Sequence, residues 1–259
     1  MAYDENGKPI QGRKLTEEEK MNLQPGKDGK VYVADNGIFN DSAAAAKYAD
    51  QHSTAGDGPQ YYIAFPEANN TLSELLIAAY QKNLENDFWG LTNATEETRL
   101  MMLLYGQDGL HLDGHSRGSL TIGNAMESIA KMPGAGGLLS GTSVSFFGPA
   151  YNAAQADQLL SFLQDRSAIS DPSQRQNMVL TLQNNIADPV GRFIGGNPAT
   201  GGTIPDGTTL LEQMIRAATG QPNTSHNCYG SPVGTSPCSK FWKDSPGEQA
   251  VSAPVNQGK

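Results

Sequence analysis

The sequence Gly-His-Ser-Arg-Gly at residues 114–118 constrains the fold of this chain more than any other feature. It joins a short strand-like run, residues 109–113, to a helix-like run, residues 120–131. A serine at the centre of such a strand-to-helix turn is strained, so the residues two before and two after it must be small. Gly114 and Gly118 meet this requirement, and the pattern predicts a nucleophile elbow with Ser116 as the nucleophile. A glycine-rich turn with an inert serine is the alternative interpretation of the bare pattern.

Strand-like and helix-like segments alternate along the chain, as they do in a parallel sheet with helices on both faces. The expected strands are residues 31–34, 60–65, 109–113, 143–147 and 178–182. The expected helices are residues 42–51, 96–104, 120–131, 153–164 and one that begins at Thr71. Together with the elbow, this order predicts an α/β fold of the α/β-hydrolase type. We place the domain at residues 30–243, between a polar tail or linker at 1–29 and a flexible C-terminal tail at 244–259.

Charge and apolar content exclude several other classes of protein. The chain has 259 residues, a formal net charge of −9 and only 18 Lys and Arg residues, which form no run. This charge disfavours nucleic acid as a partner and leaves no polybasic patch for a membrane. No apolar stretch approaches the ~20 residues of a membrane-spanning helix, and polar residues follow Met1 where a signal peptide would be apolar. We therefore expect a soluble chain without a visible export signal, and no metal or cofactor.

The order of the remaining candidates matches the α/β-hydrolase plan, in which an acid after a later strand precedes a histidine on a loop. Asp188 lies just beyond the strand expected at 178–182, and His226 is the only histidine after Ser116. We therefore predict a triad of these three residues. Other acids that follow the nucleophile remain open as rivals: Asp165, Asp171 and Asp206. The other histidines precede the nucleophile and are poor candidates for the base: His52, His111 and His115. The turn at the elbow should point the His115 side chain away from the site.

This set of residues predicts acyl transfer to water. The histidine would take the proton of Ser116 as the hydroxyl attacks an acyl carbonyl, and the aspartate would orient and support the imidazolium. One oxyanion donor should be the backbone amide of Arg117, the residue after the nucleophile. The second should come from the loop after the first strand, where Asn36 and Gly37 can expose an amide. A plain Asn-Gly turn is equally compatible with that sequence.

The only two cysteines, Cys228 and Cys238, lie in a loop rich in Gly, Pro and Ser, with no neighbouring Cys or His set for zinc. We interpret them as a short disulfide loop, which indicates an oxidising compartment, whereas two free thiols would fit a cytosolic one. Because His226 is two residues before Cys228, the disulfide would tether the loop of the predicted base.

Six blocks of sequence stand out together: residues 33–40, 62–68, 114–120, 145–150, 188–198 and 226–230. Their combination resembles the C-terminal segments of filamentous-haemagglutinin-like adhesins, the two-partner-secreted proteins of Gram-negative bacteria that include contact-dependent growth-inhibition effectors. The resemblance covers roughly residues 31–243. It implies a lipase-like toxin domain, secreted or displayed at the cell surface as part of a longer exported protein and delivered into neighbouring bacteria. It also implies a cognate immunity protein, and export directed by the N-terminus of the parent.

The substrate can be narrowed only a little from the sequence. The apolar stretches 88–89, 100–104 and 134–139 could line an acyl-chain groove or form a lid, although ordinary core packing explains each of them as well. The negative charge weakens attraction to anionic membranes, so any transient membrane contact would be apolar. We favour a lipase or phospholipase that cleaves an acyl ester or lipid. The alternatives are an esterase, thioesterase or peptidase with a soluble substrate, and a non-catalytic binding or adhesion module on a hydrolase scaffold.

Overall fold

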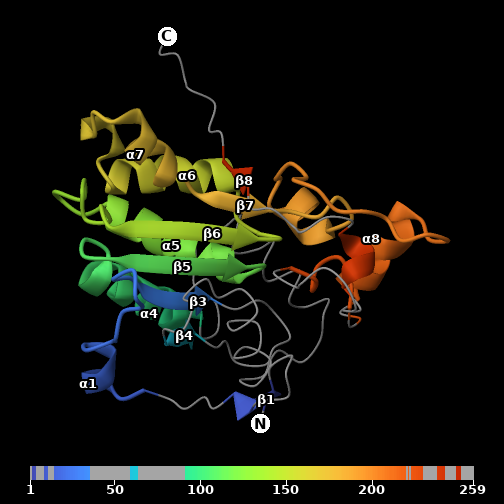
Figure 1. The fold of residues 1–259 in the computed structure, drawn as a ribbon, viewed down its shortest axis with the longest axis horizontal. Coiled ribbons are helices and arrows are strands. Elements are labelled where there is room, and N and C mark those ends of the chain that lie inside the picture. The colour runs from blue at the N-terminus through green and yellow to red at the C-terminus, as the bar shows by residue number, and fades with distance from the viewer. Residues whose placement is uncertain are drawn as a thin grey trace.

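The computed structural model describes residues 2–3, 9–10, 15–35, 59–63, 91–219, 221, 223–229, 238–242 and 249–251. Its centre is a six-stranded sheet in the order β4-β3-β5-β6-β7-β8 (Figure 1). The strands are β3 (Val31–Asp35), β4 (Gln60–Ile63), β5 (Leu110–His115), β6 (Thr142–Phe147), β7 (Thr181–Gln183) and β8 (Gln249–Ala250). The first five are parallel, and β8 is antiparallel to β7. The predicted α/β class with a mainly parallel sheet is thus confirmed.

The strand order reverses between β3 and β5. The chain runs from β3 outward to β4, returns past β3 to β5, and then continues outward through β6 and β7. In open parallel sheets, ligands bind outside the carboxyl ends of the strands beside such a reversal. Ser116 directly follows β5, so the topology puts the predicted nucleophile at the place where this class of sheet holds its sites.

Three helices cover one face of the sheet: α4 (Leu91–Tyr105), α5 (Gly118–Ala130) and α6 (Ala153–Leu163). Each connects parallel strands in the same direction across the sheet, and right-handed crossovers therefore place all three on one side, with α5 in the middle. Alternate strand residues such as Val33, Leu112 and Phe146 form the apolar core beneath them. The helices expected at 42–51 and from Thr71 lie outside the described residues.

The opposite face of the sheet is polar although it is largely buried. In β5, the two ring nitrogens of His111 bond to Ser143 Oγ at 2.8 Å and to Asp113 Oδ1 at 2.9 Å. Lys30 Nζ donates to the same Ser143 hydroxyl at 3.0 Å. Because these side chains alternate with the apolar ones, the sequence of β5 specifies both of its faces.

The shorter elements are β1 (Ala2–Tyr3), β2 (Pro9–Ile10), α1 (Glu17–Lys20), η1 (Arg166–Ala168), α7 (Pro172–Asn177), η2 (Val190–Ile194), α8 (Leu210–Ala218) and η3 (Ser239–Phe241). Strand β7 begins three residues later than predicted. Helix α7, which the Asp171 side chain caps, ends at Asn177, and residues 178–180 connect it to β7. In this connection, Leu180 N–H donates to Asp157 Oδ1 of α6 at 3.0 Å. None of the described helices is long and apolar enough to cross a membrane.

Parts of both expected tails belong to the folded domain. Leu23 is buried in the main core, and the Tyr105 hydroxyl donates to Lys20 O at 2.7 Å and accepts from Leu23 N–H at 2.9 Å. At the other end of the chain, β8 extends the sheet and Val251 packs against the core. Leu23 and residues 249–251, which lie in the segments predicted as tails, therefore contact the core or the sheet. A single buried leucine and backbone pairing outweigh the polar composition of these segments.

Candidate active site

Ser116 occupies the sharp turn between β5 and α5. Its φ of 54° lies in the left-handed region, which non-glycine residues rarely adopt, and such strain costs ~1–3 kcal/mol. Hydrogen bonds on both sides hold the turn. The Ser116 N–H donates to Phe147 O at 3.1 Å, and its carbonyl accepts from Ala150 N–H at 3.1 Å and from Ser119 Oγ at 2.6 Å. The strand, strained serine and helix therefore have the geometry predicted for a nucleophile elbow.

The neighbours of the serine are those that such a turn requires. A Cβ on Gly114 would come within 2.9 Å of the Ile122 and Phe146 side chains, so a larger residue could not be placed there without moving the core. Arg117 follows the serine as the N-cap of α5, and its amide lies at the positive end of the helix dipole. This is the position predicted for one oxyanion donor. The loop at 36–37, predicted to supply the second donor, lies outside the described residues.

His226 connects the other two members of the predicted triad. Its Nε2 lies 2.8 Å from Ser116 Oγ, and its Nδ1 lies 3.0 and 2.9 Å from Oδ1 and Oδ2 of Asp188. Because a carboxylate only accepts hydrogen bonds, Nδ1 carries the proton and Nε2 accepts from the serine hydroxyl. All three side chains are buried. The arrangement can pass the serine proton to the imidazole while the serine oxygen attacks an electrophile.

Backbone donors at the start of the short π-helix η2 hold Asp188. The N–H groups of Val190 and Gly191 donate to its Oδ1 at 2.8 and 3.3 Å. Gly148, just after β6, has a φ of 50°, and a Cβ on it would overlap both Asp188 Oδ2 and the Tyr229 ring. Asp188 is therefore the acid that the fold brings to the histidine. The rival acids lie elsewhere, at exposed or helix-capping positions: Asp165, Asp171 and Asp206.

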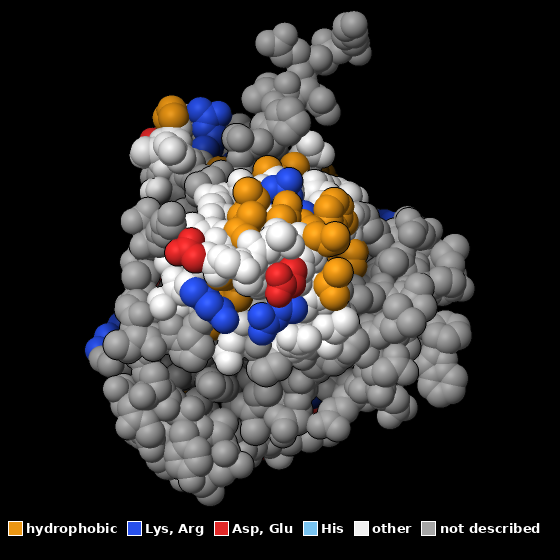
Figure 2. All heavy atoms as spheres, turned by 90° about the vertical axis from the view of Figure 1, so that its right-hand side faces the viewer, with side chains coloured by type: hydrophobic (Ala, Val, Ile, Leu, Met, Phe, Trp, Pro, Cys, Tyr) orange, Lys and Arg blue, Asp and Glu red, His pale blue; other side chains and the backbone are white. Residues whose placement is uncertain are grey.

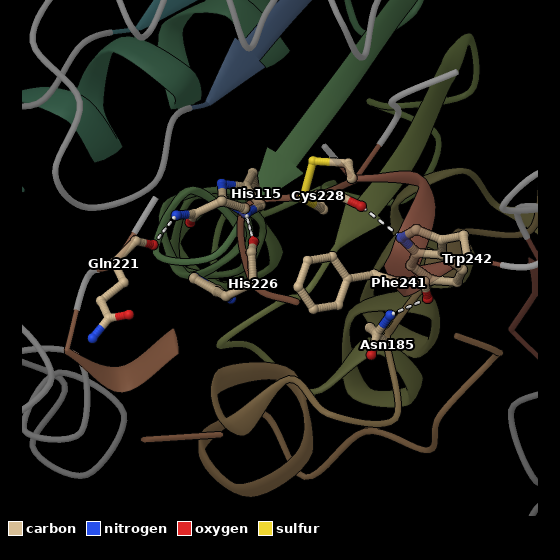
Figure 3. The surroundings of a disulfide bond; sticks show 9 residues. His115, Asn185, Gln221, His226, Cys228, Phe241 and Trp242 are labelled. Atoms are coloured by element: carbon tan, nitrogen blue, oxygen red, sulfur yellow. Dashed lines mark hydrogen bonds between the residues drawn. A yellow bond between two sulfur atoms is a disulfide. The ribbon is translucent and has the colours of Figure 1, made fainter. Parts of the chain in front are cut away.

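Hydrogen bonds also fix the loop that carries His226. Ser225 Oγ donates to Ala187 O at 2.8 Å, which ties the loop of the base to the loop of the acid. His115 Nε2 donates to the His226 carbonyl at 2.8 Å, and the two rings lie 5.0 Å apart (Figure 3). The expectation that His115 points away from the site is therefore wrong. Strand β5 continues through His115 and turns only at Ser116, so this ring lies beside the base.

Tyr229 is a residue of the site that the sequence analysis did not identify. Its hydroxyl donates to Asp188 Oδ2 at 2.5 Å and accepts from Asn185 N–H at 3.0 Å. Burial raises the pKa of the Tyr229 phenol, and the Asp188 charge raises it further, so the hydroxyl keeps its proton and donates. Each oxygen of the buried Asp188 carboxylate therefore has a donor in addition to the imidazole: two backbone N–H groups on Oδ1 and the Tyr229 hydroxyl on Oδ2. The only signal in the sequence is its position three residues after His226.

The predicted disulfide between Cys228 and Cys238 is present, with the two Cα atoms 5.2 Å apart. It joins the base loop to the segment of η3, where Trp242 Nε1 donates to Cys228 O at 2.6 Å (Figure 3). Asn185 Nδ2 donates to Phe241 O at 3.0 Å, so this segment also contacts the loop of the acid. These side chains belong to a second buried cluster: Phe147, Cys228, Tyr229, Cys238, Phe241 and Trp242. The disulfide therefore supports the base loop rather than the main core.

Asp35 is a further buried acid at the carboxyl end of the sheet. It ends β3, and its Oδ1 accepts from Thr98 Oγ1 at 2.7 Å. Burial raises the pKa of Asp35 to about 8; the hydrogen bond from Thr98 opposes this shift, and the charge of Asp113 adds to it. The side chain is therefore mainly protonated at neutral pH. It stands directly before the loop predicted to supply the second oxyanion donor.

Two of the apolar stretches considered for an acyl groove, 100–104 and 134–139, contribute side chains to the main core instead. Met101 and Met102 of α4 are buried there, as are Ala135 and Leu139. The loop at 134–139 follows α5 and precedes β6, so it lies at the opposite end of the sheet from Ser116. Residues 88–89 and His52 lie outside the described residues. Among the residues that are described, no three His, Cys, Asp or Glu side chains are grouped as metal ligands would be.

Fold and site together define an α/β protein with a hydrogen-bonded Ser-His-Asp set at the carboxyl end of a parallel sheet. Comparisons with known proteins found no relative: no protein-family model matches the sequence, and no curated protein or solved structure is significantly similar to it. The geometry of the site therefore carries the functional assignment.

Proposed function

We propose that this chain is a serine hydrolase that cleaves acyl esters, with Ser116 as nucleophile, His226 as base and Asp188 as the orienting acid. The observation that carries the proposal is the unbroken hydrogen-bond chain from the serine hydroxyl to the carboxylate, with distances of 2.8 and 2.9 Å. The strained φ of the serine supports it, because a non-catalytic binding module gains nothing from ~1–3 kcal/mol of strain at this residue.

In the proposed reaction, Ser116 Oγ attacks the ester carbonyl carbon while His226 Nε2 takes the hydroxyl proton. Asp188 accepts from Nδ1–H and stabilises the imidazolium that forms. The backbone amide of Arg117 donates to the oxyanion of the tetrahedral intermediate. The imidazolium then gives its proton to the leaving alcohol as the ester C–O bond breaks. A water molecule, deprotonated by the same imidazole, hydrolyses the acyl-enzyme and restores the serine.

We further infer that the substrate is a lipid ester, as for a lipase or phospholipase, rather than a soluble ester, thioester or peptide. Exposed apolar side chains at the same end of the sheet support this substrate class. The resemblance to filamentous-haemagglutinin-like proteins supports an antibacterial effector domain that is delivered from a longer exported protein and neutralised by an immunity protein. The disulfide supports an oxidising compartment, such as the exterior of the cell.

A fluorophosphonate probe tests the proposal directly, because it reacts with activated serines. Wild-type protein and the exposed-serine control Ser170→Ala should be labelled, with the adduct on Ser116. The Ser116→Ala variant should not be labelled, and His226→Asn should be labelled far more slowly because the base is lost. Equal labelling of wild type and Ser116→Ala, or an adduct on another residue, would reject the assignment of the nucleophile.

A further inference from the structure

Helix α8 presents apolar side chains to solvent. Its two described buried residues are Gln213 and Ala217, whereas Leu211 is 68% and Ile215 is 54% exposed. In an ordinary surface helix the apolar stripe faces the core and the polar residues face water. Here the buried edge of the helix contains a glutamine, and much of the apolar side is left uncovered. Packing among the described residues therefore does not account for these leucine and isoleucine side chains.

The exposed side chains of α8 belong to a larger surface. The described residues include ten exposed large hydrophobic side chains, and six of them come from residues 186–215. Phe193 of η2 is the most exposed, at 72%. Figure 2 views the molecule onto the carboxyl ends of the strands and shows hydrophobic side chains gathered on this face. We call the six residues the apolar face: Ile186, Phe193, Ile204, Leu210, Leu211 and Ile215.

The segments that carry the apolar face also carry the candidate catalytic residues. Phe193 lies in η2, whose first N–H groups hold the Asp188 carboxylate. The C-terminal end of α8 is tied to the base loop through Gln221. Its N–H donates to Arg216 O at 3.2 Å, and its carbonyl accepts from Asn227 Nδ2, next to the base, at 3.2 Å (Figure 3). A surface that binds the apolar face therefore lies beside the acid and the base.

The charges of this surface indicate which partner it fits. The charged residues within η2, α8 and the segment between them cancel one another: Arg192, Asp206, Glu212 and Arg216. The whole chain carries −9, so an anionic membrane would repel it. Phe193, Leu211 and Ile215 project from the short helices η2 and α8. The six side chains of the apolar face are aliphatic apart from this phenylalanine, and none is a tyrosine or tryptophan of the kind enriched in protein-protein hot spots. A helix with an exposed apolar side and little net charge is suited to lie in an uncharged lipid–water interface.

We propose that the apolar face docks this protein on a zwitterionic lipid surface, with α8 lying in the interface and Phe193 inserted beside it. This proposal rests on the proposed function for its purpose, since docking would bring acyl esters to the Ser116 end of the sheet. The docking itself requires no catalysis. Binding can therefore be measured on protein that cannot turn over lipid.

The test is flotation with vesicles of palmitoyl-oleoyl-phosphatidylcholine, using the full chain with Ser116→Ala as the parent. The parent should float with the vesicles, and adding Leu211→Ser and Ile215→Ser should weaken its partitioning by roughly tenfold or more. The matched control adds Leu103→Ser and Phe162→Ser, which are 40% and 52% exposed on α4 and α6, and should partition as the parent does. Melting temperatures verify that each variant is folded.

Three results would overturn the docking proposal. The first is unchanged partitioning of the α8 variant. The second is binding only to phosphatidylglycerol vesicles and loss of that binding in high salt, which would indicate charge-driven attachment. The third is a parent that self-associates through α8 in light scattering and does not float, which would make the face a contact between copies. Failure of the proposed function gives a different result. The wild-type protein would then carry no fluorophosphonate adduct on Ser116, while the α8 substitutions would still weaken flotation of the parent.

Discussion

Replacement of Tyr229 by phenylalanine isolates a single hydrogen bond to the acid of the proposed triad. The ring keeps its place 5.8 Å from the rings of His115 and Trp242, while the hydroxyl that donates to Asp188 Oδ2 disappears. The Asn185 N–H loses its acceptor as well. Tyr229 is a positioning residue in this account, because it acts on the substrate only through the acid and the base.

The magnitude follows from the donors that remain. A hydrogen bond to a charged group contributes ~1.5–3 kcal/mol, and Oδ2 would keep only the histidine as donor. Val190 and Gly191 still hold Oδ1, so we expect the carboxylate to turn rather than leave. If roughly half to all of this energy is lost from the transition state, about 0.75–3 kcal/mol, kcat should fall by roughly 4- to 160-fold, since 1.36 kcal/mol is a factor of ten. KM should change little, because the hydroxyl does not face the substrate.

Tyr105→Phe is the matched control. Its hydroxyl also donates one hydrogen bond, to Lys20 O, and accepts one, from Leu23 N–H. Tyr105 ends α4 just before β5 begins, whereas Ser116 follows the carboxyl end of β5, so the control lies at the opposite end of the sheet from the triad. Both variants should lose stability in thermal unfolding, by ~1–3 kcal/mol. Only Tyr229→Phe should lose turnover of p-nitrophenyl butyrate and react more slowly with the fluorophosphonate. If Tyr229→Phe is destabilised but keeps kcat within about twofold of wild type, the positioning role is wrong.

Two further predictions concern the surroundings of the site. Cys238→Ser opens a disulfide with a sequence separation of 10, which stabilises the folded chain by roughly 2–3 kcal/mol in the chain-entropy account. Because the loop of the base depends on this bond more than the main core does, turnover should fall more than the melting temperature indicates. A reduced wild type as active as the oxidised form would contradict this. For Asp35, burial raises the pKa to about 8 from an ordinary value of 3.8, so the folded state binds the proton more tightly than the unfolded state does. The free energy of unfolding of the wild type should therefore decrease as the pH rises from about 4 to about 8. Asp35→Asn cannot ionise, and its melting temperature relative to wild type should increase across this range; a constant difference would show that the carboxyl group is ionised when folded.

The elbow and the order of the triad could be predicted because local rules determine them. A strained serine at 116 needs a glycine two residues before it and a helix directly after it, and both features can be recognised in the sequence next to the serine. Asp188 and His226 follow later strands in a parallel sheet, and the carboxyl ends of such strands meet at one edge. The pairing of Cys228 with Cys238 followed from the absence of any other cysteine.

The contacts that surround the triad could not be predicted, because they join segments distant in sequence. The bond from Tyr229 to Asp188 spans 41 residues, and the bond from His115 to the His226 carbonyl spans 111. No local pattern encodes either pairing. The same reason applies to β8 and to Leu23, whose segments are polar in composition and gain their structure from partners elsewhere in the sheet and core.

The most direct measurement of the central claim is the capture of the acyl-enzyme. The protein is mixed with p-nitrophenyl butyrate, quenched in acid during the first turnovers, digested and analysed by tandem mass spectrometry. The account predicts a butyryl group on Ser116 of wild type, and for Ser116→Ala no adduct and a rate lower by a factor of about 10⁶. Hydrolysis by Ser116→Ala at the wild-type rate, or a wild type that neither hydrolyses the ester nor carries a butyryl group on Ser116, would contradict it.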